Sequence, residues 1–367
     1  MQAILEKQRR AFQLEPHVEY GTRIDRLDRA IALLVDNQEA ICEALSADYG
    51  CRSPYMTRMS EIMTSVGNLK HVKKKLKRWM KPEKRSAPVP MNLFGARAMV
   101  YHQPKGVVGN MTPWNIPIGM IFSPMADMLG AGNRVMVKPS EYTPATSALA
   151  KELVSRYFDP TEVAVVTGGP DTGAAFAALP FDHLLFTGAT SIGRRVMQAA
   201  AANLTPVTLE LGGKSPLIVG ISADIRAAAE SITSGKAQNA GQLCISPDYA
   251  FVPAARLEAF LEACAETFRA QFPTTVLNPD YNAMIDPRHY ERVAGWISEA
   301  RASGARLIEL NPGSEDWSDR GVHKIPLHIV VDPPEELRLV QEEIFGPVLV
   351  VKTYRHIDEC IAYVRAR

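Results

Sequence analysis

The chain has 367 residues, of which 46% are hydrophobic and 22% are charged, and its formal net charge is +1. These values are typical of a globular protein with two or three domains. A net charge so close to zero provides no general attraction to nucleic acid, anionic membranes or acidic partners.

The cysteines are few, odd in number and widely spaced, and no two form a CxxC pair: Cys42, Cys51, Cys244, Cys264 and Cys360. This pattern favours free thiols in a reducing compartment over a disulfide framework or a metal site. The N-terminus, MQAILEKQRRAF, is charged and lacks the apolar core of a signal peptide. No stretch approaches the roughly 18 apolar residues of a membrane span. By elimination, we expect a cytoplasmic location and no membrane segment in this chain.

The first eighty residues predict helices. One apolar helix face is marked by residues at three- and four-residue spacing: Ile24, Leu27, Ile31, Leu34 and Val35. A second helical stretch begins near Ser53 and runs into the basic segment HVKKKLKRWMKPEKR at 71–85. One interpretation of this segment is a nucleic-acid-binding arm. A solvated helix end is favoured, because the rest of the chain is not basic.

Prolines then break the helical pattern, and the segment around 86–104 predicts a β-excursion. From Gly106, short β-branched runs alternate with helical stretches, first in GVVGN, RVMVKP, EVAVVTG, HLLFTG and PVTLEL. A second alternating block contains PLIVG, YAFVP, ARLIEL, HIVVDP and PVLVVKTY. Alternation of this kind predicts α/β domains with mostly parallel sheets and crossover helices. We place the boundary between the two blocks near Gly212-Gly213.

Two residues are candidates for covalent and acid–base chemistry. Cys244 lies in NAGQLCISPDY, where Gly241 and small polar residues permit a tight backbone path whose N–H groups favour a thiolate. The alternative is a small buried hydrophobic residue, which is the commoner fate of a lone cysteine. Glu210, in TLELGGKSP, ends an apolar strand, where partial desolvation suits a general base. The alternative is a strand-end carboxylate that faces water.

Three further segments indicate oxyanion and nucleotide binding. Asn115, between two prolines in TPWNIP, is placed to donate its amide N–H to an oxyanion. The segment FTGATSIGR at 186–194 predicts a strand, a glycine turn and a helix start, which is suited to a pyrophosphate although it is not GxGxxG. Lys138 and Glu141, in VKPSE, follow another strand and are suited to the hydroxyls of an adenine ribose. Each signal alone is weak.

Together the segments are specific. In chain order, PWN, KPSE, FTGATSIGR, LELGGKSP, GQLC and QEEIFGPV resemble the motif series of the aldehyde dehydrogenase superfamily, and the similarity extends from Gly106 to Val350. The segments WMKP, KPSE and NAGQLCISPDY are most similar to the class 3 branch, in particular to its coniferyl-aldehyde-dehydrogenase-type bacterial members.

The resemblance implies a role for each matched position. Cys244 is implied as the nucleophile, Glu210 as the general base and Asn115 as the oxyanion donor. The positions implied around the cofactor are Trp114 beside the active site, Lys138 and Glu141 at the adenosine ribose, Thr187, Gly188 and Ser191 along the pyrophosphate, and Glu343 and Phe345 at the nicotinamide. No metal is implied. The implied reaction oxidises an aldehyde to a carboxylic acid through a thiohemiacetal and a thioester on the cysteine.

The resemblance also implies a domain organisation. Residues 1–85 and 105–211 would form a Rossmann-type NAD(P)-binding domain, 86–104 an oligomerisation excursion, and 212–367 the catalytic domain. Members of the family normally continue past the position of Arg367, so we expect this chain to stop short of the full catalytic domain. We also expect a homodimer once a C-terminal association segment is present.

The choice of cofactor and the substrate are inferred less directly, from single residues and from the resemblance. Glu141 would accept a hydrogen bond from a ribose 2′-hydroxyl and repel a 2′-phosphate, which favours NAD, with NADP as the alternative. The resemblance points to coniferaldehyde or another aromatic or medium-chain aldehyde, and Leu243 and Ile245 indicate an apolar pocket. Two other functions are open: a coenzyme A-acylating relative, against which Glu210 argues, and an inactive fragment that only binds nucleotide.

Overall fold

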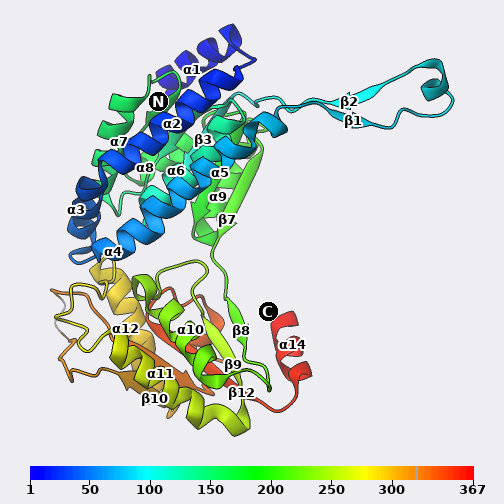
Figure 1. Ribbon diagram of the computed structural model, residues 1–367. Helices are drawn as coiled ribbons and strands as arrows, with labels where there is room; N and C mark the ends of the chain where they lie inside the picture. The colour runs from blue at the N-terminus through cyan, green and yellow to red at the C-terminus, as the bar shows by residue number, and fades with distance from the viewer. Residues whose placement is uncertain (319–320) are drawn as a thin grey trace. The chain divides into compact units, whose positions relative to one another are not determined.

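The computed structural model describes residues 1–318 and 321–367, and the chain forms two compact units (Figure 1). The first unit comprises Met1–Ala44 and Arg58–Leu211, and the second comprises Leu45–Thr57 and Gly212–Arg367. Residues 45–57 belong to the second unit, whereas the sequence analysis placed them with the first. The reason is backbone pairing, since the Ala283 N–H donates to the Cys51 carbonyl at 3.0 Å.

The first unit consists of helices around one main sheet. Its helical segments are α1 (Gln2–Leu14), α2 (Tyr20–Asp36), most of α3 (Gln38–Tyr49), the π-helical turn η1 (Arg58–Met63), α5 (Thr64–Trp79), α6 (Pro117–Gly130), α7 (Pro144–Tyr157), α8 (Pro170–Ala177) and α9 (Thr190–Ala201). The strands of the main sheet are β3 (Val107–Met111), β4 (Arg134–Lys138), β5 (Val163–Val165), β6 (His183–Gly188) and β7 (Val207–Leu211).

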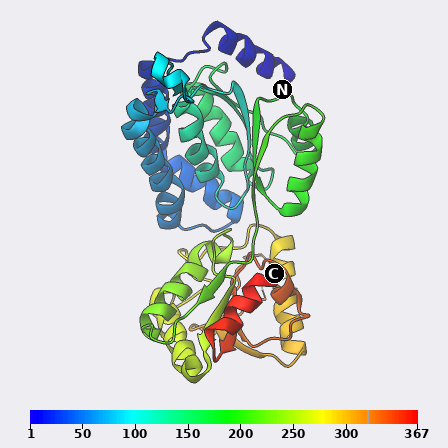
Figure 2. The same ribbon diagram turned by 90° about the vertical axis from the view of Figure 1, so that its right-hand side faces the viewer.

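These five strands are parallel and lie in the order β5-β4-β3-β6-β7. Strands β3, β4 and β5 are buried along their whole length, as expected for a parallel sheet covered by helices on both faces (Figure 2). The chain builds outward from β3 to β5 and then returns to the other side of β3. The direction of winding therefore reverses between β3 and β6, and in such sheets a ligand binds at the carboxyl ends of the strands beside that point.

Helix α2 shows how the N-terminal helices pack. Leu27 and Leu34 are fully buried and Ile24 and Ile31 are half-buried, so the predicted apolar face is largely correct. Val35 was wrongly included, because its side chain is 44% exposed. At about 100° per residue, position 35 lies on the same stripe as the half-buried positions 24 and 31, at the edge of the fully buried face formed by Leu27, Ala30 and Leu34.

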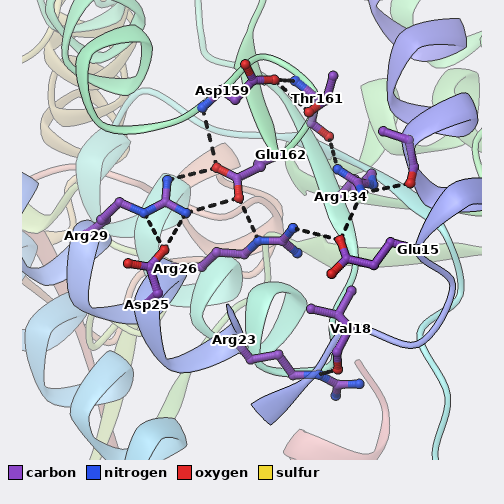
Figure 3. A network of polar contacts seen from close by, with 11 residues as sticks. Glu15, Val18, Arg23, Asp25, Arg26, Arg29, Arg134, Asp159, Thr161 and Glu162 are labelled. Atoms are coloured by element: carbon purple, nitrogen blue, oxygen red, sulfur yellow. Dashed lines mark hydrogen bonds and ion pairs between the residues drawn. The ribbon is translucent and has the colours of Figure 1, made fainter. Parts of the chain in front are cut away.

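A network of charged side chains joins α2 to the β4–β5 connection (Figure 3). Glu162 accepts hydrogen bonds from Arg26 at 2.9 Å and from Arg29 at 2.8 Å, and the Arg26 side chain is only 2% exposed. Burial alone would raise the pKa of Glu162, but the hydrogen bonds from Arg29 and Arg26 outweigh it and hold the pKa below its ordinary value. The network fixes the helical layer on the sheet.

A narrow ribbon projects from the body of the first unit (Figure 1). Strand β1 (Glu83–Arg85) pairs antiparallel with β2 (Ala98–Val100), and a short 3-10 turn, η2 (Met91–Phe94), lies between them. This is the β-excursion predicted around 86–104.

The second unit has its own five-stranded sheet. Its helical segments are α4 (Pro54–Thr57), α10 (Ile225–Ala237), the 3-10 turns η3 (Gln238–Gly241) and η4 (Ala254–Arg256), α11 (Leu257–Gln271), α12 (Pro287–Ala302), α13 (Arg338–Gln341) and α14 (Ile357–Arg365). The strands are β8 (Pro216–Ile218), β9 (Tyr249–Pro253), β10 (Arg306–Leu310), β11 (Leu327–Val331) and β12 (Val348–Tyr354).

The order of this sheet is β10-β11-β12-β9-β8, and only the β10–β11 pairing is antiparallel. Alternate residues of β12 enter two different apolar clusters: Val348 and Val350 pack in one, and Leu349 and Val351 pack in the other. Both faces of the sheet are therefore covered. The predicted α/β architecture with mostly parallel strands is confirmed. Over residues 1–318 and 321–367, no helix is long and apolar enough to cross a membrane.

Candidate active site

In the first unit, the predicted residues gather at one edge of the sheet. Each motif follows the carboxyl end of a parallel strand: TPWN after β3, PSE after β4, ATS after β6, and Glu210 near the end of β7. Because β3 and β6 flank the reversal of winding, TPWN and ATS lie where an α/β sheet binds its ligand. The topology thus collects four separate sequence segments at the edge suited to a dinucleotide.

The turn after β3 carries Trp114 and Asn115. It leads directly into α6, whose first residue is Pro117. The Asn115 side chain is 5% exposed, and Trp114 is half-buried. A buried amide on a turn between two prolines has little conformational freedom, which suits a donor that must be in place before an oxyanion forms.

Lys138 and Glu141 form an ion pair next to this turn. The Lys138 ammonium donates to the Glu141 carboxylate at 2.9 Å, and the Lys138 side chain is 5% exposed against 36% for Glu141. Burial alone would raise the pKa of Glu141, but the Lys138 hydrogen bond and charge lower it below its ordinary value. Glu141 is therefore an accessible, ionised hydrogen-bond acceptor, and its partner is a buried cation.

Between β6 and α9 lies the candidate phosphate-binding turn. Helix α9 begins at Thr190, its N-cap residue Ala189 provides no side-chain cap, and its first turn contains no acidic residue. Ser191 is exposed, and Thr187 and Gly188 are half-buried. An N-terminus without a side-chain cap or a nearby carboxylate suits an anionic group, as the partial positive charge of the helix end favours it.

The environment of Glu210 differs from the prediction of a partly desolvated carboxylate. It lies on β7 opposite Thr187 in the register of the sheet, but its side chain is exposed and not partly desolvated. The physical reason is that side chains alternate between the two faces of a strand, and Glu210 shares the uncovered face of β7 with the exposed Thr208, whereas Leu209 and Leu211 are half-buried on the other face. The carboxylate is hydrated where it stands, which still suits a group that must deprotonate a water molecule.

In the second unit, Cys244 is exposed on the loop between η3 and β9. Three successive residues before it, Asn239, Ala240 and Gly241, have φ values of +48°, +50° and +73°. Left-handed backbone is unfavourable for alanine and persists only where the surroundings enforce it. The fully buried Gln242 supplies part of that support, because its amide donates to the Asn239 carbonyl at 2.9 Å and to the Ala283 carbonyl at 3.0 Å. The alternative of a small buried cysteine is excluded.

Glu343 and Phe345 lie on the loop that leads into β12. The Glu343 carboxylate is half-buried, and a Cβ added to Gly212 would stand 2.0 Å from its Oε2. Burial raises the pKa of Glu343, although a hydrogen bond from the Gly213 N–H partly offsets the effect. Phe345 has a φ of +47°, and the Arg292 guanidinium donates to the preceding carbonyl of Ile344 at 2.8 Å. These loops thus meet at the amino ends of β9 and β12, opposite to the arrangement in the first unit.

Charged residues that the sequence analysis did not single out lie among these loops. Lys214 pairs with Asp248 at 2.7 Å, and Lys236 is 1% exposed. Burial lowers the pKa of Lys236 to about 8. The only sequence signal was the position of Lys214 and Asp248 inside LELGGKSP and NAGQLCISPDY. Among the described residues, no cluster of three or more His, Cys, Asp or Glu side chains is suited to a metal ion.

The chain matches the Aldehyde dehydrogenase family over residues 1–366. It is 48% identical over 367 residues to a probable coniferyl aldehyde dehydrogenase of Caulobacter vibrioides, covering 100% of this chain and 76% of that protein. The chain belongs to the aldehyde dehydrogenase family. It is also 46% identical over 356 residues to a coniferyl aldehyde dehydrogenase of a Pseudomonas species, covering 96% of this chain and 73% of that protein.

Solved structures of aldehyde dehydrogenases share this fold. The substrate-bound state of Staphylococcus aureus AldH matches with a TM-score of 0.92 and 31% identity, covering 100% of this chain and 78% of that one. A Mycobacterium tuberculosis aldehyde dehydrogenase complexed with NAD+ matches with a TM-score of 0.85 and 28% identity, covering 98% and 74%. The predicted membership and fold are confirmed, and the protein is an oxidoreductase that acts on aldehydes.

Proposed function

We propose that this aldehyde dehydrogenase oxidises an aromatic aldehyde to its carboxylic acid with NAD as the hydride acceptor and Cys244 as the nucleophile. The observation that carries the proposal is the exposed Cys244 thiol on a loop with three successive left-handed residues. A thiol held on such an enforced backbone is available to a substrate and fixed in direction.

In the first chemical step the Cys244 thiolate forms a bond with the aldehyde carbon. As that bond forms, the carbonyl oxygen becomes an oxyanion, which the Asn115 amide and the Cys244 backbone N–H stabilise by hydrogen bonding. NAD, when bound, accepts the hydride that the same carbon loses. The thiol then carries the acyl group as a thioester.

Glu210 completes the reaction by deprotonating a water molecule. The hydroxide adds to the thioester carbon, the carbon–sulfur bond breaks, and the carboxylic acid leaves with Cys244 restored as a thiolate. The exposed position of Glu210 at the end of β7 supports this role, because it gives the carboxylate direct access to water.

The residues at the carboxyl edge of the first sheet fit a dinucleotide. We assign the pyrophosphate to the N-terminus of α9 with Thr187, Gly188 and Ser191, since this helix end has no side-chain cap. We assign the adenosine ribose to Lys138 and Glu141. An ionised Glu141 accepts from a 2′-hydroxyl and repels a 2′-phosphate, which supports NAD over NADP.

Glu343 and Phe345 are assigned to the ribose and the ring at the nicotinamide end of the cofactor, and Trp114 is assigned to the active site by its motif. On this basis we assign residues 1–85 and 105–211 to cofactor binding and residues 212–367 to catalysis. The segment 45–57 is the exception, because it packs with the second unit.

Coniferaldehyde is the substrate we propose, because two of the chain's relatives are named for its oxidation. Exposed Ile245 beside the thiol supports an apolar, aromatic-accepting site. The test is NADH formation from NAD with coniferaldehyde and hexanal, alongside Cys244→Ser. We expect turnover with a higher kcat/KM for coniferaldehyde and none in the variant. Turnover by Cys244→Ser, or none with either aldehyde by the folded parent, would contradict the proposal.

We also propose that the protein is a cytoplasmic homodimer that associates through the β1–β2 ribbon. Large apolar side chains on this ribbon are exposed: Val89 (76%), Met91 (58%), Leu93 (77%) and Phe94 (84%). A thin ribbon with these side chains has no core of its own, so a second copy of the chain is a fitting cover for them. Light scattering of the parent and of Phe94→Asp tests this: we expect a dimer that the substitution dissociates. A monomeric parent would contradict it.

A further inference from the structure

A buried ion pair joins three loops at the amino edge of the sheet in the second unit. The Lys214 ammonium donates to Asp248 Oδ2 at 2.7 Å, and their side chains are 14% and 4% exposed. Lys214 lies two residues before the start of β8, and Asp248 lies directly before β9. Burying an ion pair this deeply costs desolvation free energy that can exceed the attraction between the two charges. We therefore ask how the pair fixes the geometry of the groups around it.

The same two side chains hold the backbone on both sides of Glu343. Lys214 donates a further hydrogen bond to the Glu342 carbonyl at 2.9 Å, and Asp248 Oδ1 accepts from the Ile344 N–H at 3.2 Å. Lys214 also donates to the Leu339 carbonyl at 2.9 Å. Glu343 therefore sits between two anchored residues and cannot shift along the chain direction without breaking one of these bonds.

The pair is equally tied to the loop that carries the thiol. Ser215, next to Lys214, donates its hydroxyl to the Cys244 carbonyl at 3.4 Å. The Asp248 N–H, four residues beyond Cys244, donates to the Ser215 carbonyl at 3.1 Å. The ion pair and the adjacent Ser215 thus connect the loop that carries Cys244 to the loop that carries Glu343.

We propose that Lys214 and Asp248 are positioning residues, which set the Glu343 carboxylate relative to the Cys244 thiol. This inference rests on the proposed function, in which Glu343 holds the nicotinamide ribose and Cys244 attacks the aldehyde. Neither Lys214 nor Asp248 touches the reacting atoms in this role. They act by fixing the two residues that do, and errors of about 1 Å in such geometry reduce rates about a hundredfold.

The test compares Asp248→Asn, Lys214→Gln and Lys214→Arg with the parent and with a matched control, Glu315→Gln. Glu315 is also a carboxylate that fixes a loop, because it accepts from the N–H groups of Thr275 and Val276, but that loop holds none of the proposed site residues. Three quantities are measured for each protein: the thermal midpoint, the rate of Cys244 alkylation by iodoacetamide, and the kcat and NAD KM of NADH formation. Subtracting the alkylation of Cys244→Ser removes the contribution of the other thiols.

We expect Asp248→Asn and Lys214→Gln to raise the NAD KM and to slow Cys244 alkylation, each by about tenfold. Lys214→Arg keeps the positive charge that pairs with Asp248 but not the compact ammonium, so it should change both readouts less than Lys214→Gln does. Glu315→Gln should lower the thermal midpoint and leave both site readouts unchanged. If Asp248→Asn does not fold, Lys214→Gln and Lys214→Arg decide the question.

Two results would overturn the inference. One is a folded Asp248→Asn or Lys214→Gln with the parental alkylation rate and NAD KM. The other is a control, Glu315→Gln, that perturbs both readouts as strongly, since the effect would then be general loosening of the unit. Failure of the proposed function is distinct: the parent would form no NADH, while the alkylation comparison would still test the positioning.

Discussion

Replacement of Gly212 by alanine should displace Glu343 and leave the fold intact. A Cβ at position 212 would stand 2.0 Å from Glu343 Oε2 and 2.9 Å from its carboxyl carbon. Ordinary carbon–oxygen contacts begin near 3.4 Å, so the carboxylate must retreat by roughly 1.4 Å. The obstructing group is the end of a flexible side chain and not backbone, so the strain is relieved by rotation of Glu343.

The adjacent glycine provides the matched control. A Cβ at Gly213 would meet nothing within 4 Å, and the alanine retains the N–H that bonds to Glu343. If Glu343 positions the nicotinamide ribose, a displacement of this size should lower kcat/KM for NAD between about tenfold and a hundredfold in Gly212→Ala. Gly213→Ala should behave like the parent.

The assay is the initial rate of NADH formation as a function of NAD concentration at saturating aldehyde, with thermal unfolding in parallel. Equal kinetics for the two variants would refute the reasoning, because the carboxylate would then move without consequence. A Gly212→Ala protein that loses its fold would refute it in another way, since the structure attributes the clash to a movable side chain.

Three further predictions concern stability. Gly241→Ala should destabilise the protein by about 2 kcal/mol or more, because the φ of Gly241 is +73° and a Cβ would lie 2.2 Å from the Gly346 carbonyl oxygen. Urea unfolding measures this change, and a decrease in unfolding free energy under half that size would contradict the strain argument. Glu162→Gln should lower the unfolding free energy by about 3 kcal/mol, since it removes the carboxylate that pairs with the buried Arg26 at 2.9 Å and leaves only Glu15, at 3.9 Å, as its anionic partner. Parental stability in the same urea assay would show that the network contributes little. Burial lowers the pKa of Lys236 from 10.5 to about 8. Between pH 8 and pH 10.5 the unfolded chain binds a proton on Lys236 that the folded chain does not bind. The free energy of unfolding of the parent should therefore rise with pH relative to that of Lys236→Met, by up to about 3 kcal/mol in all. A difference in unfolding free energy between the two proteins that stays constant from pH 8 to 10.5 would contradict the lowered pKa.

The strands were predictable because burial on both faces leaves a plain mark on the sequence. Runs such as RVMVKP and PVLVVKTY are apolar and β-branched with turn residues at each end, and the structure has strands there. The boundaries of amphipathic faces were less certain. Val35 adjoins the buried Leu34 in sequence, and only the packing of α2 decides which of them reaches the core.

The site residues of the first unit were easier to predict from the sequence than those of the second unit. In the first unit, motifs after strand ends gather because parallel strands share a carboxyl edge. In the second unit the loops of Cys244 and Glu343 meet at amino ends, and their anchoring by Lys214 and Asp248 depends on contacts between residues 34 apart in sequence. No local pattern encodes such a contact. Likewise, Gly241 was recognised as a turn residue, whereas the left-handed Asn239 and Ala240 follow from tertiary support.

The exposure of Glu210 illustrates a third kind of limit. The end of an apolar strand suggested partial desolvation, but a sequence does not say which face of a strand is covered by the rest of the protein. Because Glu210 lies on the uncovered face of β7 together with Thr208, the carboxylate is exposed to water. The proposed base is therefore placed for water activation, and its environment differs from the one inferred from the motif.

The most direct test of the account is the mass of the enzyme caught between the two chemical steps. Glu210→Gln is incubated with NAD and coniferaldehyde, quenched in acid, and examined by intact mass and peptide mapping. The account predicts that NADH forms in one equivalent and that Cys244 gains the mass of the aldehyde less two hydrogens, the mark of a thioester awaiting hydrolysis. NADH formation with an unmodified Cys244, or with the acyl group on another residue, would contradict it.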